Sequence, residues 1–264
     1  MCATCGCSDD GHVTLHDPAT GEHAHPGGSG FHRHDEGHVH GPGTARVVRV
    51  EADVLGKNQA LADANRRGFR ERSVLALNVM SSPGAGKTTL LERTIRDLKG
   101  TVEIRVVEGD PETSRDAERI RAAGARVIQV NTGAACHLDA SMVSEAARRL
   151  EPPPGSLLLI ENVGNLICPA LFDLGEDARV VVASVTEGDD KPLKYPHMYR
   201  EAALVLLNKV DLLPHVDFDA RAFEERVRAL APAALCARVS ARTGEGIGEW
   251  YRWLTTRTKT ARTR

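Results

Sequence analysis

The chain of 264 residues carries 34 Lys and Arg against 36 Asp and Glu, so its overall charge indicates neither a nucleic acid nor an anionic membrane as a partner. No apolar run approaches the roughly 18 residues that span a bilayer, and the amino terminus lacks the pattern of a signal peptide. We therefore expect a cytoplasmic protein. Because thiols stay reduced in that compartment, the six cysteines indicate metal binding or redox chemistry before disulfides.

The first 42 residues differ in composition from the rest of the chain. Gly, His, Asp and Pro dominate them, and eight of the 11 histidines lie there. A segment this polar cannot bury enough apolar surface to offset the entropy that it loses on ordering. We therefore predict a disordered, metal-binding tail rich in Cys and His over residues 1–42, and one folded domain over residues 43–264.

The folded region alternates between helix-like and strand-like patterns. In chain order we expect a helix over 45–71, a buried strand over 74–80, a helix over 88–98, a strand over 102–107, a helix over 114–123, a strand over 126–130, a helix over 138–150, strands over 156–160, 179–184 and 203–208, a last strand near 235–239, and a closing helix marked by Ile247, Trp250, Trp253 and Leu254. Such alternation, with strands rich in Val and Leu, predicts an α/β fold with a mainly parallel sheet between two layers of helices. Ligands of such folds bind at the carboxyl ends of the strands.

A glycine-rich segment, SSPGAGKTT (Ser81 to Thr89), directly follows the first expected strand of the folded region. A turn of this kind between a strand and a helix presents backbone N–H groups to phosphate oxygens. Ser81 stands where the G-x-x-x-x-G-K-[ST] pattern has its first Gly, which weakens the match to the pattern more than it weakens the chemistry. We therefore predict a P-loop, in which Lys87 neutralises the β and γ phosphates and the Thr88 hydroxyl binds Mg²⁺. Its nucleotide-binding residues are Gly84, Ala85, Gly86, Lys87, Thr88 and Thr89.

The segment NKVD (Asn208 to Asp211) closes a later strand and indicates which base is bound. A carboxylate only accepts hydrogen bonds, and Asp211 can accept two from the N1–H and the exocyclic amine of guanine. Following a P-loop in the same sheet, Asn208, Lys209 and Asp211 therefore predict guanine specificity. Ser240 and Ala241 lie where a further loop would contact the guanine O6 through a backbone amide.

Two more strand ends carry acidic residues that suit phosphate chemistry. In ENVG (Glu161 to Gly164) the carboxylate could hold Mg²⁺ through water, and the Gly164 amide could sense the γ-phosphate. In VVEGD, Asp110 is our candidate for the magnesium shell or for orienting the attacking water. The predicted catalytic residues are Lys87, Asp110, Glu161 and Gly164, and the predicted magnesium-binding residues are Thr88, Asp110 and Glu161.

The folded region also contains a possible metal site made of Cys136, His137 and Cys168. Thiolate and imidazole ligands suit Zn²⁺ and also Ni²⁺. Cys168 lies four residues after Gly164, so a metal there would contact the loop that senses the nucleotide. Cys236, inside the apolar segment ALCARV, is interpreted as a core residue.

These segments together resemble the HypB family of hydrogenase maturation GTPases, which serve nickel insertion. MCATCGC resembles that family's amino-terminal cysteine element, and SSPGAGKTTLLE, NTGAACHLDA, ENVGNLICPA, TEGDDKPLKYP and NKVDLLP resemble successive blocks of its G domain. The resemblance implies a P-loop NTPase fold of the SIMIBI type. It also implies a high-affinity nickel site at Cys2, Cys5 and Cys7, and a weaker nickel or zinc site at Cys136, His137 and Cys168.

The resemblance further implies a set of partners. Family members pair through their G domains when GTP binds, and they work with a zinc-containing nickel chaperone of the HypA type and with the precursor of the hydrogenase large subunit. The paired histidines of the tail fit weak binding of several nickel ions, although a solvated His-rich spacer remains an alternative. These histidines are His23, His25, His32, His34, His38 and His40.

From the sequence we expect a slow GTP hydrolase that uses GTP and Mg²⁺ to control the delivery of Ni²⁺ to a [NiFe]-hydrogenase. No residue is identifiable as an arginine finger, which is why intrinsic turnover should be slow. One alternative is a nickel store whose G domain only regulates the tail. Another is a related GTPase that serves urease or a cobalamin enzyme, although MCATCGC and the adjacent Cys136 and His137 argue against the urease version.

Overall fold

A computed structural model describes residues 15–17, 22–24, 43–110, 115–133 and 135–263, with side chains from residue 55 onward. Within these residues the chain forms two compact units, Met1–Gly56 and Lys57–Arg264, which are described separately. In the first unit, the strands β1 (Leu15–Asp17) and β2 (Glu22–Ala24) pair antiparallel. The long helix α1 (Gly43–Glu71) begins in the first unit and ends in the second.

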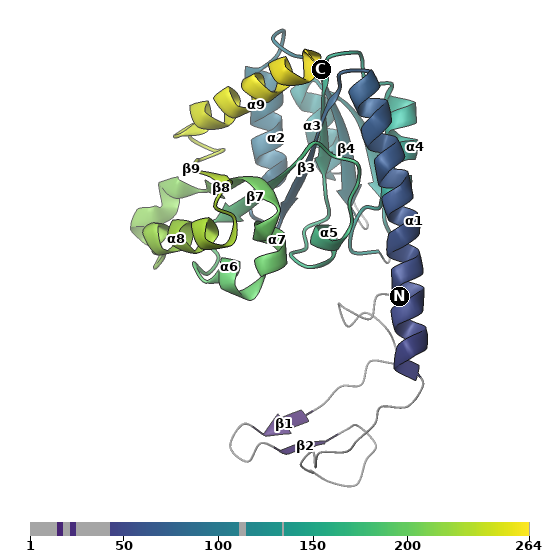
Figure 1. Cartoon of the computed structure of the whole chain (residues 1–264). Helices are drawn as coiled ribbons and strands as arrows, with labels where there is room; N and C mark the ends of the chain where they lie inside the picture. Colours follow the sequence, from purple (N-terminus) through teal and green to yellow (C-terminus); the bar gives the residue numbers. More distant parts are fainter. Residues whose placement is uncertain (1–14, 18–21, 25–42, 111–114, 134, 264) are drawn as a thin grey trace. The chain divides into compact units, whose positions relative to one another are not determined.

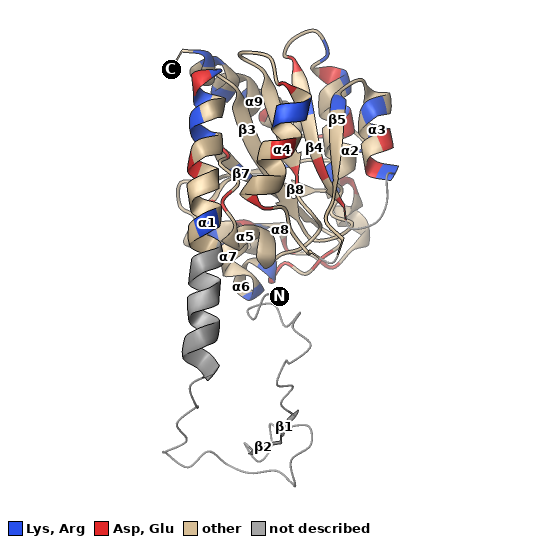
Figure 2. Cartoon of the chain, turned by 90° about the vertical axis from the view of Figure 1, so that its right-hand side faces the viewer, with Lys and Arg blue, Asp and Glu red and all other residues tan. Residues whose placement is uncertain are grey.

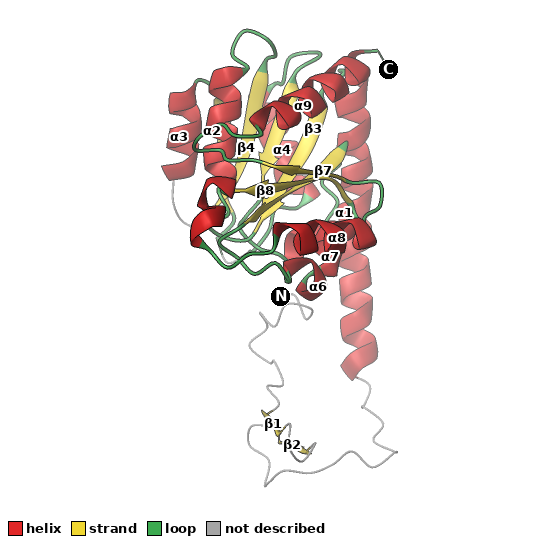
Figure 3. Ribbon diagram, turned by 90° about the vertical axis from the view of Figure 1, so that its left-hand side faces the viewer, coloured by secondary structure: helices red, strands yellow, loops and turns green. Residues whose placement is uncertain are grey.

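The second unit is built on a seven-stranded sheet with the strand order β5-β4-β6-β3-β7-β8-β9. Every neighbouring pair in it is parallel, which confirms the predicted mainly parallel sheet between helices (Figures 1 and 3). The strands are β3 (Leu75–Ser81), β4 (Ile104–Asp110), β5 (Arg126–Asn131), β6 (Leu157–Glu161), β7 (Ala178–Ser184), β8 (Ala202–Asn208) and β9 (Leu235–Arg238).

Helices cover both faces of this sheet (Figure 1). They are the end of α1, then α2 (Lys87–Asp97), α3 (Arg115–Ala123), α4 (Ala140–Leu150), α5 (Cys168–Leu171), α6 (Lys191–Lys194), α7 (Pro196–Arg200), α8 (Ala220–Leu230) and α9 (Ile247–Arg262), with a 3₁₀ helix η1 over Val210–His215. Lys and Arg are interspersed with Asp and Glu over the face that carries α1, α4 and α3 (Figure 2). No helix in the described part of the chain is long and apolar enough to cross a membrane.

The strand β3 lies at the centre of the sheet, and all seven of its residues are buried. Because side chains alternate along a strand, Leu75, Leu77 and Val79 pack with α2, α3 and α9 in one apolar cluster. On the opposite face, Ala76 packs with α4 and the end of α1, and Met80 packs with α7 and α8. This two-sided burial explains the nearly continuous apolar run from which the strand was predicted.

Most predicted elements are confirmed within one or two residues, but the strand expected over 102–107 lies over Ile104–Asp110. The helix expected from residue 138 begins only at Ala140, because Asp139 caps it by accepting a hydrogen bond from the Met142 amide at 2.8 Å. The closing helix marked by Ile247, Trp250, Trp253 and Leu254 is confirmed as α9, in which Trp250 is fully buried and Trp253 half-buried. The helix α8 was not predicted, although Asp219 caps it and its buried side chains Phe223 and Val227 follow helical spacing. The division of the chain near Pro42 stays a prediction.

One buried hydrogen bond joins α9 to α2, and its removal should measurably destabilise the fold. The indole N–H of Trp250 donates to the Thr94 hydroxyl at 2.8 Å, and both residues are 0 % exposed. We expect Trp250→Phe to lower the free energy of unfolding by about 1–3 kcal/mol, because it leaves Thr94 without its donor and leaves a small cavity. Urea denaturation without nucleotide measures this change. Trp253→Phe, at a half-buried position, should cost less, and equal costs for the two variants would contradict this assignment.

Candidate functional site

The P-loop spans the turn between the end of β3 and the start of α2. Gly86 has φ 100°, and a Cβ atom on it would lie 2.5 Å from the side-chain nitrogen of Asn208. Only glycine satisfies both conditions, since other residues rarely adopt this φ and would also collide with Asn208. The 11-residue helix α2 begins directly after Gly86, with no side-chain cap, and the first N–H groups of a helix have no partner within it, as the predicted anion site requires.

The P-loop borders a cavity of about 470 Å³ at the carboxyl edge of the sheet. Its lining includes the predicted residues Gly84, Gly86, Lys87, Thr88, Thr89, Asp110, Glu161 and Gly164. The Lys87 ammonium donates to the Ser81 hydroxyl at 2.8 Å, and burial lowers the pKa of Lys87. Ser81, where the sequence departs from the P-loop pattern, is thus a hydrogen-bond partner of Lys87.

Two buried carboxylates lie side by side beneath this cavity. Glu108 in β4 is in register with Glu161 in β6, and they are 2 % and 3 % exposed. The Thr88 hydroxyl donates to Glu161 Oε1 at 2.7 Å, while Glu161 Oε2 and Glu108 Oε2 have no hydrogen-bond partner among the described residues. Orphaned buried oxygens next to a threonine hydroxyl fit a site for Mg²⁺, which prefers oxygen ligands.

Desolvation and the neighbouring charge act together on these carboxylates. Burial, and then the proximity of Glu161, raises the pKa of Glu108 to about 8. Burial raises the pKa of Glu161 to about 6, although Lys87 and the Thr88 hydroxyl oppose the shift. Without a cation, Glu108 therefore binds a proton at neutral pH.

The structure adds two residues to this site that the sequence did not single out. Asp116 in α3 lies with Glu108 and Asp110 in a group whose carboxylate oxygens are within 4.8 Å of one another. Arg119, one turn further, lines the cavity and donates to Asp116, to Glu92 and to the Thr89 hydroxyl, at 3.0, 2.8 and 3.1 Å. Both follow residues 111–114, which lie outside the described residues.

Two of the predicted base-binding residues contact the backbone of the P-loop. Asn208 donates to Ala85 O at 2.8 Å, and the Lys209 ammonium donates to Gly84 O at 2.8 Å. Lys209 adopts a left-handed φ of 63°, which places η1 and Asp211 beside the strand end. The Asp211 Oδ1 atom is buried and has no hydrogen-bond partner in the described structure, as a receptor for guanine donors requires.

The loop that carries Ser240 and Ala241 lies next to Asn208. The Ala241 amide donates to Asn208 Oδ1 at 3.0 Å, and the Ser240 amide donates to Glu245 O at 2.8 Å. Both amides therefore already donate hydrogen bonds to other groups of the protein. The predicted contact of this loop with the guanine O6 stays a prediction, and in this arrangement it would need another donor.

Cys136, His137 and Cys168 form the second constellation. Their possible ligand atoms lie within 4.8 Å of one another, with Cys136 and His137 half-buried and Cys168 buried. The His137 ring packs on Phe172 with the ring centroids 4.0 Å apart, and burial lowers the pKa of His137. A neutral imidazole beside two thiols is a donor set that suits Ni²⁺ or Zn²⁺.

Two asparagines connect the metal constellation to the nucleotide loop. Asn162, the residue after Glu161, accepts a hydrogen bond from the Leu138 amide at 3.1 Å. Asn165, the residue after Gly164, donates to Cys136 O at 3.4 Å. A Cβ atom on Gly164 would lie 3.0 Å from Pro83 of the P-loop, so the same segment is also packed against the phosphate site.

The remaining predicted ligands belong to the tail. Cys2, Cys5, Cys7, His25, His32, His34, His38 and His40 lie outside the described residues. The backbone of His23 lies in β2. Cys236 lies half-buried in β9, where burial raises the pKa of its thiol to about 12, in agreement with its interpretation as a core residue.

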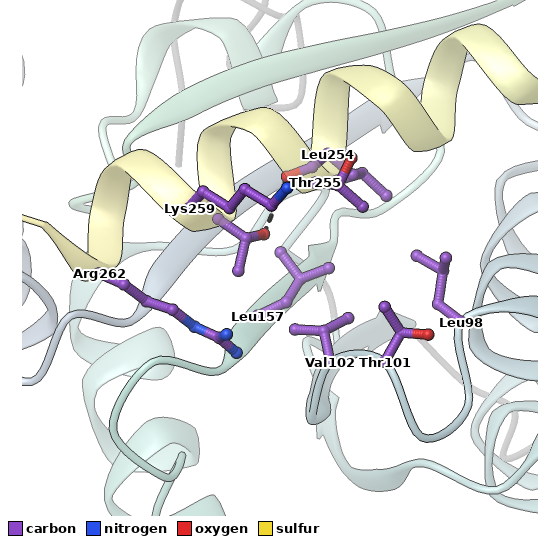
Figure 4. Close-up of a pocket in the computed structure, with 9 residues that line it drawn as sticks. Leu98, Thr101, Val102, Leu157, Leu254, Thr255, Lys259 and Arg262 are labelled. Carbon is purple, nitrogen blue, oxygen red and sulfur yellow. Dashed lines mark hydrogen bonds between the residues drawn. The ribbon is translucent and has the colours of Figure 1, made fainter.

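A second, smaller cavity of about 60 Å³ lies near the start of β6 and the end of α9 (Figure 4). Its walls are mainly apolar, with Leu98, Val102, Leu157 and Leu254 among them. Arg262 at its rim donates to Gly155 O at 3.0 Å. The polar groups that line this cavity do not form a catalytic arrangement.

Comparison with known proteins identifies the family. The family model for the CobW/HypB/UreG nucleotide-binding domain matches residues 75–238. Hydrogenase maturation factor HypB from Rhizobium leguminosarum is 57 % identical over 217 residues, which covers 82 % of this chain and 73 % of that protein. The chain belongs to the HypB family. HypB from Azotobacter vinelandii is 47 % identical over 278 residues, with 96 % and 91 % of the two chains covered.

A crystal structure of HypB from Helicobacter pylori in complex with nickel has the same fold. It superposes with a TM-score of 0.73 at 38 % identity and covers 77 % of this chain and 96 % of its own. The resemblance expected from the sequence is therefore confirmed, and the cavity at the P-loop belongs to a nucleotide-binding domain.

Replacing Glu108 should change how stability depends on pH. The folded protein keeps a proton on Glu108 up to about pH 8, whereas the unfolded chain loses it near its ordinary pKa of 4.5. The unfolded state then binds fewer protons, so the free energy of unfolding falls between about pH 5 and 8, by up to about 1.4 kcal/mol per pH unit. Glu108→Gln lacks this contribution.

Urea denaturation at several pH values, without nucleotide and with a chelator, measures the effect. The variant should gain stability relative to the unmodified protein as pH rises. Parallel stability curves for the two proteins would show that Glu108 is already ionised in the folded state.

Proposed function

We propose that this protein is a GTP hydrolase that binds nickel and delivers it during the maturation of [NiFe]-hydrogenase. The proposal rests on the position of the segment from Glu161 to Cys168, which lies at the nucleotide cavity at one end and at the metal constellation at the other. It begins with a carboxylate that accepts from Thr88 of the P-loop, and it ends with a thiol beside Cys136 and His137. The name of the family and the nickel complex of the H. pylori relative support the cargo.

Guanine specificity rests on the paired donors of the base. The buried, unpartnered Asp211 Oδ1 would accept from guanine, whereas adenine offers no such donor pair. Asn208 and Lys209 donate hydrogen bonds to the P-loop backbone. The segment that would bind the base is therefore bonded directly to the loop that would bind the phosphates.

Hydrolysis would use the groups at the carboxyl edge of the sheet. Lys87 would leave the Ser81 hydroxyl for the β and γ phosphates, and Thr88, Asp110 and Glu161 are the residues that would hold Mg²⁺, which supplies charge neutralisation when bound. Asp110 also lies where it could orient the attacking water. Arg119 adds positive charge beside Thr89, but its pairing with Glu92 and Asp116 fits a slow intrinsic rate.

The affinity of the protein for nickel would depend on whether GTP or GDP is bound. The γ-phosphate of GTP would order the Gly164 segment, and loss of that phosphate on hydrolysis would release the segment. Because Asn162 and Asn165 bond to Leu138 and Cys136, such a change would alter the geometry of the Cys136, His137 and Cys168 site. Zinc is the tetrahedral competitor of nickel for the same ligands.

Further parts of the proposal come from the sequence and from the family. Cys2, Cys5 and Cys7 would form a high-affinity nickel site, and the tail histidines a weak one. The partners would be a second copy of the chain when GTP is bound, a nickel chaperone of the HypA type, and the precursor of the hydrogenase large subunit. A cytoplasmic location stays a prediction that rests on the use of thiols.

Hydrogenase activity in a strain that lacks this protein tests the proposal. The full chain should restore activity without added nickel, and Lys87→Ala should not. A chain without residues 1–42 should restore part of the activity, more so with added nickel. If the shortened chain restored nothing while Lys87→Ala retained activity, the protein would be a nickel store whose G domain is not required.

Base specificity gives a second test. In Asp211→Asn the side-chain amide can donate to the C2 carbonyl of xanthine, but with one oxygen replaced by an NH2 group it cannot accept from both the N1–H and the amine of guanine. We expect GTP affinity to fall by about 100-fold or more and XTP to bind more tightly than GTP, as measured by competition with a fluorescent nucleotide. Asp217→Asn, at an exposed position after η1, should leave both affinities unchanged. Unaltered GTP binding in Asp211→Asn would exclude Asp211 from the base site.

A further inference from the structure

Helix α1 approaches both segments that carry the predicted metal ligands. Asn58 and Asn65 project from it and are each 8 % exposed. Neither residue belongs to a motif recognised in the sequence, and neither touches the nucleotide cavity. Their hydrogen-bond partners lie more than 70 residues away in the chain.

Asn58 joins the two ligand segments directly. Its Oδ1 atom accepts from the Ala140 amide at 2.9 Å, three residues after His137. Its Nδ2 atom donates to Asp173 O at 2.8 Å. Asp173 follows Phe172, whose ring packs on His137, and Phe172 directly follows the short helix α5 that begins with Cys168.

Asn65, two turns along the same helix, makes a second bridge of the same kind. Its Nδ2 atom donates both to Ala140 O at 2.8 Å and to Leu174 O at 3.1 Å. The two asparagines thus use both the N–H and the C=O of Ala140. They bind the backbone of the opposite segment at two consecutive residues, Asp173 and Leu174.

The contact between α1 and the second ligand segment is also tight. Arg66 pairs with both oxygens of Asp173 at 2.6 Å. Gly175 has φ 87°, and a Cβ atom on it would lie 2.5 Å from Ala62 O and 2.6 Å from Asn65 Cβ. The segment after Cys168 therefore lies directly on the backbone of α1, with no room for it to shift toward the helix.

We propose that Asn58 and Asn65 are positioning residues that set the affinity and geometry of the Cys136, His137 and Cys168 metal site by holding its two ligand segments at a fixed separation. The inference rests on the proposed function, because it requires that these three residues bind a metal ion. It differs from a purely structural role, in which the asparagines would contribute stability but leave metal affinity unchanged.

Cobalt(II) tests the inference, because its absorption reports thiolate coordination. The starting protein is the full chain with Cys2, Cys5 and Cys7 replaced by Ser, so that the thiolate signal comes from the G domain. Asn58→Leu and Asn65→Leu remove the bridges without adding charge. We expect each to weaken cobalt binding by about tenfold or more and to change the absorption spectrum, while GDP affinity stays the same.

Two controls separate the possible outcomes. The double variant Cys136→Ser, Cys168→Ser should abolish the thiolate signal of the site, and if it did not, the metal assignment itself would fail. Trp250→Phe removes a buried hydrogen bond on the other face of the sheet and should leave cobalt binding unchanged. If the two Leu variants bound cobalt like the starting protein, or if Trp250→Phe lost as much affinity as they do, the positioning role would be refuted.

A measurement without any change in α1 covers the case in which a Leu variant does not fold. By reciprocity of linked equilibria, metal binding must stabilise the bridges if the bridges stabilise metal binding. Hydrogen exchange of the Ala140 amide, which bonds to Asn58, should therefore slow when cobalt is added to the starting protein. Unchanged exchange at Ala140, with cobalt bound, would overturn the proposal.

Discussion

A single buried amide, the side chain of Asn162, connects the nucleotide cavity to the metal constellation. It is 1 % exposed. Its Oδ1 atom accepts from Leu138 N and Val163 N, and its Nδ2 atom donates to Asn78 Oδ1 at 3.2 Å. Leaving such a group unpaired in the core costs about 1–3 kcal/mol. The loop after β6, the segment after His137 and the central strand are therefore joined through this one side chain.

The nucleotide cavity lies over two carboxyl groups whose simultaneous ionisation is unfavourable. Glu108 and Glu161 are buried side by side, and two of their oxygens have no partner within the described structure. Lys87 compensates in part, but burial lowers its own pKa. Functional sites commonly violate the rules that stabilise a core. Here a cation and an anionic phosphate group would supply the missing partners, so nucleotide binding would also stabilise the fold.

The two sites use different means to achieve rigidity. The P-loop is held by local backbone geometry and by the nearby Asn208 and Lys209. Cys136 and His137 lie in irregular structure and Cys168 begins the four-residue helix α5, and the asparagines of α1 bond to the backbone that follows each segment. A site built on such short segments needs support, because its ligands must be kept within a fraction of an ångström of the productive geometry.

The sequence alone predicted the features that depend on neighbouring residues. The alternation of strands and helices, the strand–turn–helix around Gly86 and Lys87, and the NKVD strand end are local patterns, and the structure places them as expected. The adjacent Cys136 and His137 were also recognised locally. What tertiary structure decided is which distant segments meet. Asp116 and Arg119 join the cavity because α3 packs beside α2, and Asn58 reaches Asp173 across 115 residues. Such contacts produce no periodic pattern in the sequence, because they arise only when packing of the core brings the segments together.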